Sequence, residues 1–215
     1  MQYSLRWKIA QLAEIRWWQN YLSKRDASEY LSWKKNYWQT FLERIGITPL
    51  PEQRVLDIGC GPAGIFIQLT SQQVTAVDPL LSQYASKLDH FDVADYQHVT
   101  FCTQALEVYQ ADTPFPLVFC INAINHVSDL SLAWDRLVES TAVGGTLVVS
   151  IDAHNYRFLK HLFRLLPGDI LHPHQYDLSE YCAMLSARNC NITRTIRYKK
   201  EGIFDYWVLV AKRVQ

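Results

Sequence analysis

The pattern of apolar positions changes near residue 48 of this 215-residue chain. Before that point, apolar side chains recur at the three- and four-residue spacing of a helix. They include Leu5, Ile9, Leu12, Tyr30, Phe41 and Ile45. Because no proline interrupts this part, the pattern predicts two helices, over about 2–22 and 27–45, with Gly46 as the stop signal.

Beyond Pro49 and Pro51, which resist helix, short and nearly continuous apolar runs alternate with helix-length segments. The runs cover 54–58, 74–77, 99–102, 117–121 and 146–151, and helices are expected over about 63–71, 80–89, 130–141 and 178–188. Such runs are typical of parallel strands that are buried on both faces. The alternation predicts an α/β fold with a Rossmann-like doubly wound sheet.

The last part of the chain has a different pattern. Two β-rich runs, 191–198 and 204–211, are joined by a short polar segment that ends in Gly202. This arrangement predicts a hairpin, so the sheet should close with an antiparallel pair. We therefore expect a helical lid or appendage over 1–48 and a second domain over 52–215 that carries the sheet.

Composition and charge exclude several classes of protein. The 21 basic and 21 acidic side chains give no net charge, which disfavours a nucleic-acid partner bound through phosphates. No run of about 18 apolar residues predicts a membrane span, and charges interrupt the N-terminal segment too often for a signal peptide. The five scattered cysteines then indicate reduced thiols and a cytoplasmic location.

The N-terminal helical segment is rich in tryptophan. Five of the seven tryptophans lie there: Trp7, Trp17, Trp18, Trp33 and Trp38. So many aromatic side chains on two helices need a cover. They could pack onto the main domain, form a lid over a ligand pocket, or hold a homodimer together, and the sequence leaves these three options open.

The strongest motif is a glycine-rich loop. The run 54–58 leads into Gly59-Cys60-Gly61-Pro62-Ala63-Gly64, which has the G-x-G-x-x-G spacing. Glycines let a backbone turn sharply and approach a ligand closely, and the helix expected after the loop would present free N–H groups. Asp78 follows the next apolar run, where a carboxylate can accept hydrogen bonds from both hydroxyls of a ribose. The pattern therefore predicts a nucleoside cofactor.

Asp57 favours a cofactor that carries positive charge. It lies two residues before Gly59, where a carboxylate would repel the pyrophosphate of a dinucleotide. An amino group or a sulfonium would instead be attracted. The terminal hairpin also takes the place of the second nucleotide-binding half that a dinucleotide fold requires.

These residues resemble the class I S-adenosylmethionine-dependent methyltransferases, and in particular their small-molecule branch. The motifs that carry the resemblance are 55–64, 74–79, 101–106, 117–127 and 144–150, within a region of about 54–151. The resemblance implies S-adenosylmethionine as the cofactor and a sheet order of 3-2-1-4-5-7-6, with strand 7 antiparallel.

The resemblance also implies roles for single residues. The methionine part would lie against Gly59, Cys60 and Gly61, and Asp57 would hold its ammonium directly or through water. The ribose would be bound by Asp78 and Pro79, and the adenine would be bordered by Gln104, Ala105 and Leu106. Asn122 would lie where the fourth strand opens to cofactor and acceptor. Gln104 stands where many relatives have an acid, and its carbonyl could accept the same hydrogen bond.

Transfer of a methyl group from a sulfonium needs alignment and exclusion of water, and a base only for some acceptors. His126, after the fourth strand, is the first candidate base, and His174 in the loop before the last helix is the second. His172 and His174 lack an evident third ligand, so no metal is expected. His154 is expected on a helix surface.

The acceptor is the least defined part. No D/N-P-P-Y motif follows the fourth strand, which argues against methylation of base amines in nucleic acids. The most economical interpretation is methyl transfer to an oxygen or nitrogen atom of a small organic metabolite. Two alternatives remain: a non-catalytic S-adenosylmethionine-binding sensor or partner protein, and an RNA or protein methyltransferase that recruits its target through 1–48.

Overall fold

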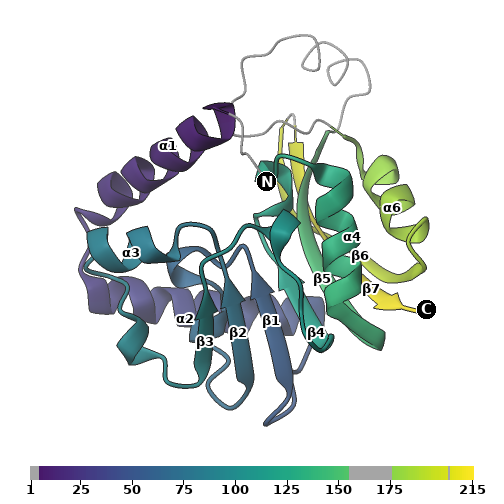
Figure 1. Ribbon diagram of the computed structural model, residues 1–215, viewed down its shortest axis with the longest axis horizontal. Coiled ribbons are helices and arrows are strands. Elements are labelled where there is room, and N and C mark those ends of the chain that lie inside the picture. Colours follow the sequence, from purple (N-terminus) through teal and green to yellow (C-terminus); the bar gives the residue numbers. More distant parts are fainter. Residues whose placement is uncertain (1–4, 155–175, 203) are drawn as a thin grey trace.

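The computed structural model describes residues 5–154, 176–202 and 204–215 of the chain. Within these residues, seven strands form one sheet in the order β3-β2-β1-β4-β5-β7-β6, as the resemblance implies (Figure 1). The strands are β1 (Arg54–Ile58), β2 (Gln73–Val77), β3 (Val99–Cys102), β4 (Phe115–Cys120), β5 (Thr141–His154), β6 (Cys190–Glu201) and β7 (Phe204–Arg213). Strand β7 pairs antiparallel with both β5 and β6, which confirms the expected hairpin.

The helices are α1 (Leu5–Leu22), α2 (Ala27–Ile45), α3 (Leu81–Lys87), α4 (Leu130–Ser140) and α6 (Leu178–Ser186). Helix α2 begins at an N-cap, since the Asp26 carboxylate accepts hydrogen bonds from the N–H groups of Ser28 and Glu29. It ends at Gly46, whose left-handed φ of 61° confirms the predicted stop signal.

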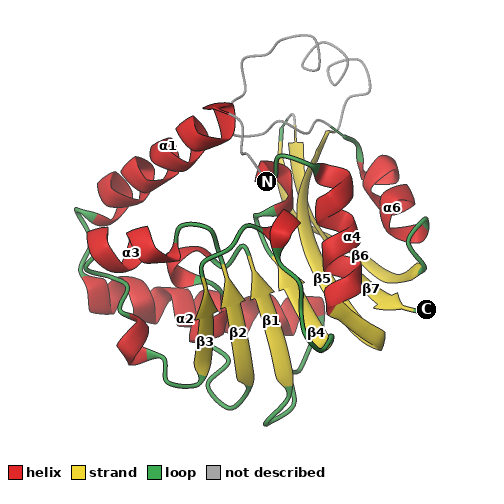
Figure 2. Cartoon of the chain, in the orientation of Figure 1, coloured by secondary structure: helices red, strands yellow, loops and turns green. Residues whose placement is uncertain are grey.

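The two faces of the sheet bury separate hydrophobic clusters, because successive side chains of a strand point to opposite faces. Val55 of β1 belongs to the same cluster as Phe41 of α2, whereas its neighbour Leu56 belongs to the same cluster as Trp134 of α4. Figure 2 shows the same arrangement, with α2 crossing the sheet on one face and α4 on the other. Helix α2 therefore belongs to the core that supports the sheet.

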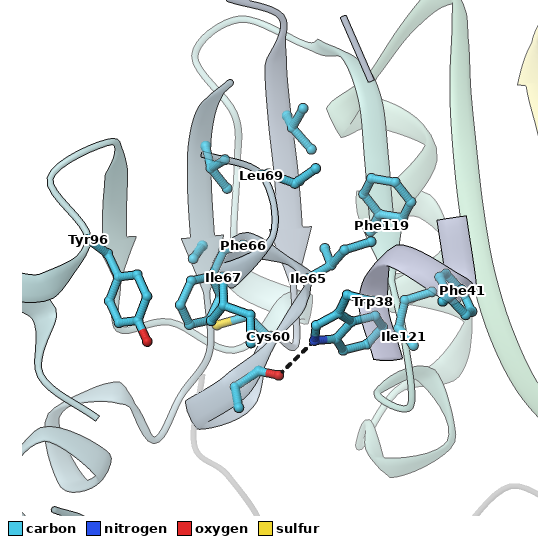
Figure 3. Close-up of a cluster of buried hydrophobic side chains, with 14 of the residues drawn as sticks. Trp38, Phe41, Cys60, Ile65, Phe66, Ile67, Leu69, Tyr96, Phe119 and Ile121 are labelled. Carbon is cyan, nitrogen blue, oxygen red and sulfur yellow. Dashed lines mark hydrogen bonds between the residues drawn. The ribbon is translucent and has the colours of Figure 1, made fainter. Parts of the chain in front are cut away.

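Trp38 fixes α2 against the glycine-rich loop. Its side chain is buried, and its indole N–H donates to the backbone carbonyl of Ala63 over 3.0 Å, as Figure 3 shows. Phe41, Phe119 and Ile121 belong to the same apolar cluster. The contact brings the N-terminal helices to the edge of the sheet at which the loop lies.

The predicted helix over 63–71 is wrong. Only two short 3₁₀ turns form, η1 (Gly61–Ala63) and η2 (Ile65–Ile67). Gly64 between them is extended, with ψ of −176°, so the helical path is interrupted. The Asp57 carboxylate accepts a hydrogen bond from the Phe66 N–H over 3.2 Å and stabilises this irregular path.

His154 corrects a second expectation. It ends β5, which is longer than the predicted 146–151, and it is buried rather than on a helix surface. Its ring lies 4.3 Å from that of Phe204, centroid to centroid. The antiparallel pairing with β7 extends β5 beyond its most apolar stretch, which is why the hydrophobic pattern alone underestimated its length.

His174 lies outside the described residues, so its role stays a prediction. Within the described parts, no helix combines the length and hydropathy that crossing a bilayer requires.

The division at residue 48 and a homodimer through the N-terminal helices also stay predictions. Trp17 and Trp33, which could serve such a dimer, are each about half exposed.

Candidate cofactor and acceptor site

A cavity of about 760 Å³ lies at the carboxyl ends of the parallel strands, and side chains of α1 and α2 line it together with the residues that follow these strands. Its volume is within the usual range for small-molecule sites. Most of the residues that the sequence assigned to the site line this one cavity: Gly59, Cys60, Gly61, Asp78, Pro79, Ala105, Leu106, Asn122 and His126. The strand order places them together, because ligands bind where neighbouring parallel strands end.

Asp78 is the buried acid of the cavity wall. Its two carboxylate oxygens accept hydrogen bonds from the Gly61 N–H over 3.0 Å and from the Leu80 N–H over 2.8 Å. One bond orients the carboxylate, and the other ties it to the glycine-rich loop. The side chain is only 6% exposed, and that remaining surface is presented to the cavity.

Glu14 of α1 lines the same cavity and was not identified from the sequence. Its carboxylate accepts a hydrogen bond from the Tyr84 hydroxyl over 2.9 Å. Burial, and then the nearby negative charge of Glu14, raise the pKa of Asp78 to about 7. A sequence signal exists in retrospect: Gln11, Glu14, Trp18 and Tyr21 follow helical spacing and share one face of α1.

The pKa of Asp78 predicts how cofactor affinity depends on pH. The ionised carboxylate is the stronger acceptor for ribose hydroxyls, so binding should favour it and strengthen as pH rises through about 7. Calorimetry with S-adenosylhomocysteine should therefore show about tenfold tighter binding at pH 8 than at pH 6. The Asp78→Asn variant should lose the part of this pH dependence that comes from Asp78, and a wild-type affinity that stays constant over the range would contradict the assignment.

Asp57 lies beneath the loop rather than in the cavity wall. It is 2% exposed and accepts the Phe66 N–H, and burial raises its pKa to about 7. A Cβ on Gly64 would come within 2.5 Å of the Asp57 carboxylate oxygen, so the third glycine of the motif makes room for the acid. Direct contact of Asp57 with a cofactor ammonium stays a prediction, and so does contact through water.

On the adenine side, the structure separates the predicted residues. Ala105 and Leu106 line the cavity, whereas the Gln104 side chain is exposed and does not. Glu107, which the sequence analysis missed, lies in the wall and is buried. Its carboxylate accepts the Ser128 N–H over 2.6 Å, so it fixes the segment after β4 beside the cavity.

The end of β4 provides the junction between the two halves of the cavity. Asn122 adopts a left-handed φ of 56°, and its N–H donates to the Ser150 hydroxyl of β5 over 2.7 Å. The sharp turn leads into η5 (Ile124–His126), which places His126 in the cavity wall. An imidazole at this position can hold a proton from an acceptor that lies between the helices and the loop.

The helices supply the aromatic wall. Trp17, Trp18, Trp33 and Trp38 line the cavity together with Tyr21 and Tyr30. The Trp17 and Tyr21 rings stack, with centroids 4.8 Å apart and an interplanar angle of 10°. Flat apolar surfaces of this kind suit a flat or apolar acceptor and exclude water from it.

The loop suits a sulfonium nucleoside better than a dinucleotide. Its N–H groups at Gly61 and Phe66 donate to the Asp78 and Asp57 carboxylates and are not available to a phosphate. Cys60 is buried, and burial with the nearby acids raises the pKa of its thiol, so it packs rather than reacts. No cluster of three or more metal-ligating side chains occurs within the described parts of the chain.

Comparisons with known proteins agree with this geometry. The model of a family described as a methyltransferase domain matches residues 30–195. A ubiquinone biosynthesis O-methyltransferase from Nitrobacter winogradskyi is 28% identical over 134 residues, which cover 58% of this chain and 49% of that protein. One from Rickettsia bellii is 27% identical over 103 residues, covering 47% of this chain and 42% of that protein. The chain thus spans about half, or less, of the length of the curated relatives it matches.

Solved structures share the fold. The N-methyltransferase NodS from Bradyrhizobium japonicum, in complex with S-adenosylhomocysteine, superposes with a TM-score of 0.64 at 12% identity, over 96% of this chain and 100% of that one. The 1,6-didemethyltoxoflavin-N1-methyltransferase from Burkholderia thailandensis gives 0.61 at 14% identity, over 100% and 93%. Since the family model matches most of the chain and the sheet order agrees, the chain belongs to the class I S-adenosylmethionine-dependent methyltransferases.

Proposed function

We propose that this methyltransferase acts on an oxygen or nitrogen atom of a small, partly aromatic organic acceptor. The observation that carries the proposal is the composition of the single cavity described above. One wall holds the glycine-rich loop and Asp78, and the other is built from the tryptophans and tyrosines of α1 and α2. A cofactor on the first wall would face an acceptor on the second.

The residues present fit the cofactor. Asp78 would hold the ribose hydroxyls, and Gly59 and Gly61 would allow close approach of the backbone to the methionine part. Bound S-adenosylmethionine supplies an electrophilic methyl group on a positively charged sulfur. The protein then contributes alignment of the acceptor by the aromatic wall, exclusion of water by α1 and α2, and proton removal.

Two observations refine the proposal. The curated relatives are named as O-methyltransferases, which favours an oxygen acceptor over a nitrogen acceptor. All five cysteines are free thiols, which supports a reducing compartment such as the cytoplasm. An acceptor hydroxyl must lose a proton on methylation, so an oxygen acceptor also requires a general base, for which His126 is the candidate.

His126→Ala should lower turnover far more than cofactor affinity. A general base typically contributes about 10²–10⁴-fold to the rate, while His126 lies on the acceptor side of the cavity, after β4. We expect kcat to fall at least about tenfold and the affinity for S-adenosylhomocysteine to change less than about twofold. His98→Gln is the matched control, because that ring contacts the Phe66 carbonyl and does not line the cavity. Full activity of His126→Ala would eliminate the base assignment.

The function itself is tested by methyl transfer. The protein is incubated with methyl-labelled S-adenosylmethionine and a metabolite extract, and the products are separated to find the labelled component. Transfer to a small molecule that is absent with Asp78→Asn supports the proposal. Tight binding of S-adenosylhomocysteine without transfer to any component would instead favour a non-catalytic sensor or partner protein.

A further inference from the structure

Lys34 of α2 is the cationic side chain of the cavity wall that the proposed mechanism does not use. Its ammonium lies among three aromatic rings, 5.6 Å from the centroid of Trp33 and 5.2 Å from those of Tyr37 and Trp38. It forms no ion pair with any residue that the structure describes. The side chain is therefore a partly buried positive charge that lies beside three rings and lines the cavity.

The aromatic rings alone do not satisfy this ammonium. Rings at these distances attract a cation electrostatically but leave its N–H donors without strong acceptors. Burial accordingly lowers the pKa of Lys34 to about 8, and no nearby carboxylate counteracts that effect. An anion bound in the cavity would supply the negative charge and the hydrogen-bond acceptors that the surrounding side chains do not give to Lys34.

The acids of the cavity have other partners. Glu14 accepts from the Tyr84 hydroxyl, Asp78 accepts from the Gly61 and Leu80 N–H groups, and Glu107 accepts from the Ser128 N–H. These are the carboxylates that line the same space as Lys34. The negative charges thus belong to the wall formed by the sheet edge and α1, while α2 contributes the positive charge.

Tyr30 adds a second donor on the same helix face. It precedes Lys34 by one helical turn and also lines the cavity. Its side chain is 4% exposed, and its hydroxyl is buried without a hydrogen-bond partner. A buried hydroxyl without a partner is costly, so a ligand acceptor atom near α2 would stabilise both groups.

We propose that Lys34, assisted by Tyr30, binds the carboxylate of an aromatic acid that is the acceptor, and so selects acidic over neutral acceptors. The ring of such an acid would pack against the tryptophans beside Lys34, and its carboxylate would lie at the ammonium. The proposal rests on the proposed function, since it names the class of acceptor for that same cavity. A carboxylate also occurs in the amino-acid part of the cofactor, and the test separates these two sources.

The first arm measures binding and needs no turnover. Calorimetry compares aromatic carboxylates, such as 3,4-dihydroxybenzoate, with neutral partners such as catechol, in the presence of S-adenosylhomocysteine. Wild type should bind the carboxylates at least about tenfold more tightly, and Lys34→Met should remove this preference. Lys34→Arg should restore part of it. Lys35→Met is the matched control, because Lys35 is exposed on the same helix and does not line the cavity.

The second arm compares S-adenosylhomocysteine with 5′-methylthioadenosine, which lacks the amino acid. If Lys34→Met weakens the first at least tenfold and spares the second, the lysine binds the cofactor carboxylate and the proposal is overturned. Equal wild-type affinity for carboxylates and neutral partners also overturns it, as does an unchanged preference in folded Lys34→Met. Carboxylate selectivity without methyl transfer would support the site while contradicting the proposed function.

Discussion

Asp78→Asn should weaken binding of S-adenosylhomocysteine by about 10- to 100-fold, measured by calorimetry at pH 8. Hydrogen bonds to a charged acceptor contribute about 1.5–3 kcal/mol each, and the variant replaces the carboxylate by a neutral amide. Asparagine keeps an oxygen that can accept the Leu80 N–H, but its amide nitrogen cannot accept the Gly61 N–H, which loses its partner. We therefore expect a loss of stability of about 1–3 kcal/mol in addition to the loss of ligand affinity.

Asp92→Asn provides a control with the same local geometry. The Asp92 carboxylate accepts the Ala94 N–H over 2.9 Å, two residues on, just as Asp78 accepts the Leu80 N–H. Asp92 lies before η3 (Val93–Asp95) and does not line the cavity. Equal ligand affinities in wild type and Asp78→Asn would remove Asp78 from the site. Equal losses in Asp78→Asn and Asp92→Asn would show that the effect belongs to turns in general.

The sheet edge of the site was predictable because its signals are local. The apolar runs predicted β1 to β4, and the turns that follow them carry Gly59, Asp78 and Asn122. Parallel strands must end at the same edge, so their following residues converge whatever the rest of the chain does. This side of the cavity wall can thus be predicted, because each strand and the turn after it are indicated by a short stretch of sequence.

The helical wall was less predictable because its position depends on packing. Spacing predicted α1 and α2, but nothing in their sequences states that Glu14 lies beside Asp78 or that Lys34 faces the same cavity. That geometry follows from the contact of Trp38 with Ala63, which joins segments 25 residues apart. Lysine and glutamate on a helix are ordinarily solvated, so their residue types gave no signal of burial.

The helix predicted over 63–71, after β1, was wrong for a further reason. Ile65, Phe66 and Ile67 are fully or almost fully buried, and an apolar run of this length fits either a helix or an irregular segment. The irregular path is stabilised by Asp57, whose carboxylate accepts a hydrogen bond from the Phe66 N–H beneath the loop. A buried carboxylate that organises backbone N–H groups is a tertiary feature, and hydrophobic periodicity does not detect it.

Gly59→Ala should destabilise the fold by about 2–5 kcal/mol and weaken binding of S-adenosylhomocysteine at least about tenfold. The φ of Gly59 is 73°, a conformation that costs a side-chain-bearing residue about 1–2 kcal/mol. An added Cβ would also clash with the Cβ of Ala123, in the segment after β4. The loop and the segment that carries Asn122 would have to move apart, and both line the cofactor side of the cavity.

Gly144→Ala separates the two causes. Gly144 has a similar φ of 75°, but an added Cβ would meet nothing within 4 Å. Denaturant unfolding should therefore show a loss of about 1–2 kcal/mol for Gly144→Ala, and its ligand affinity should match that of wild type. A larger loss for Gly59→Ala, with weaker ligand binding in whatever fraction stays folded, would locate the second cause in the contact with Ala123. If the two variants lose equal stability and both bind normally, the loop does not approach the segment after β4 as closely as the structure shows.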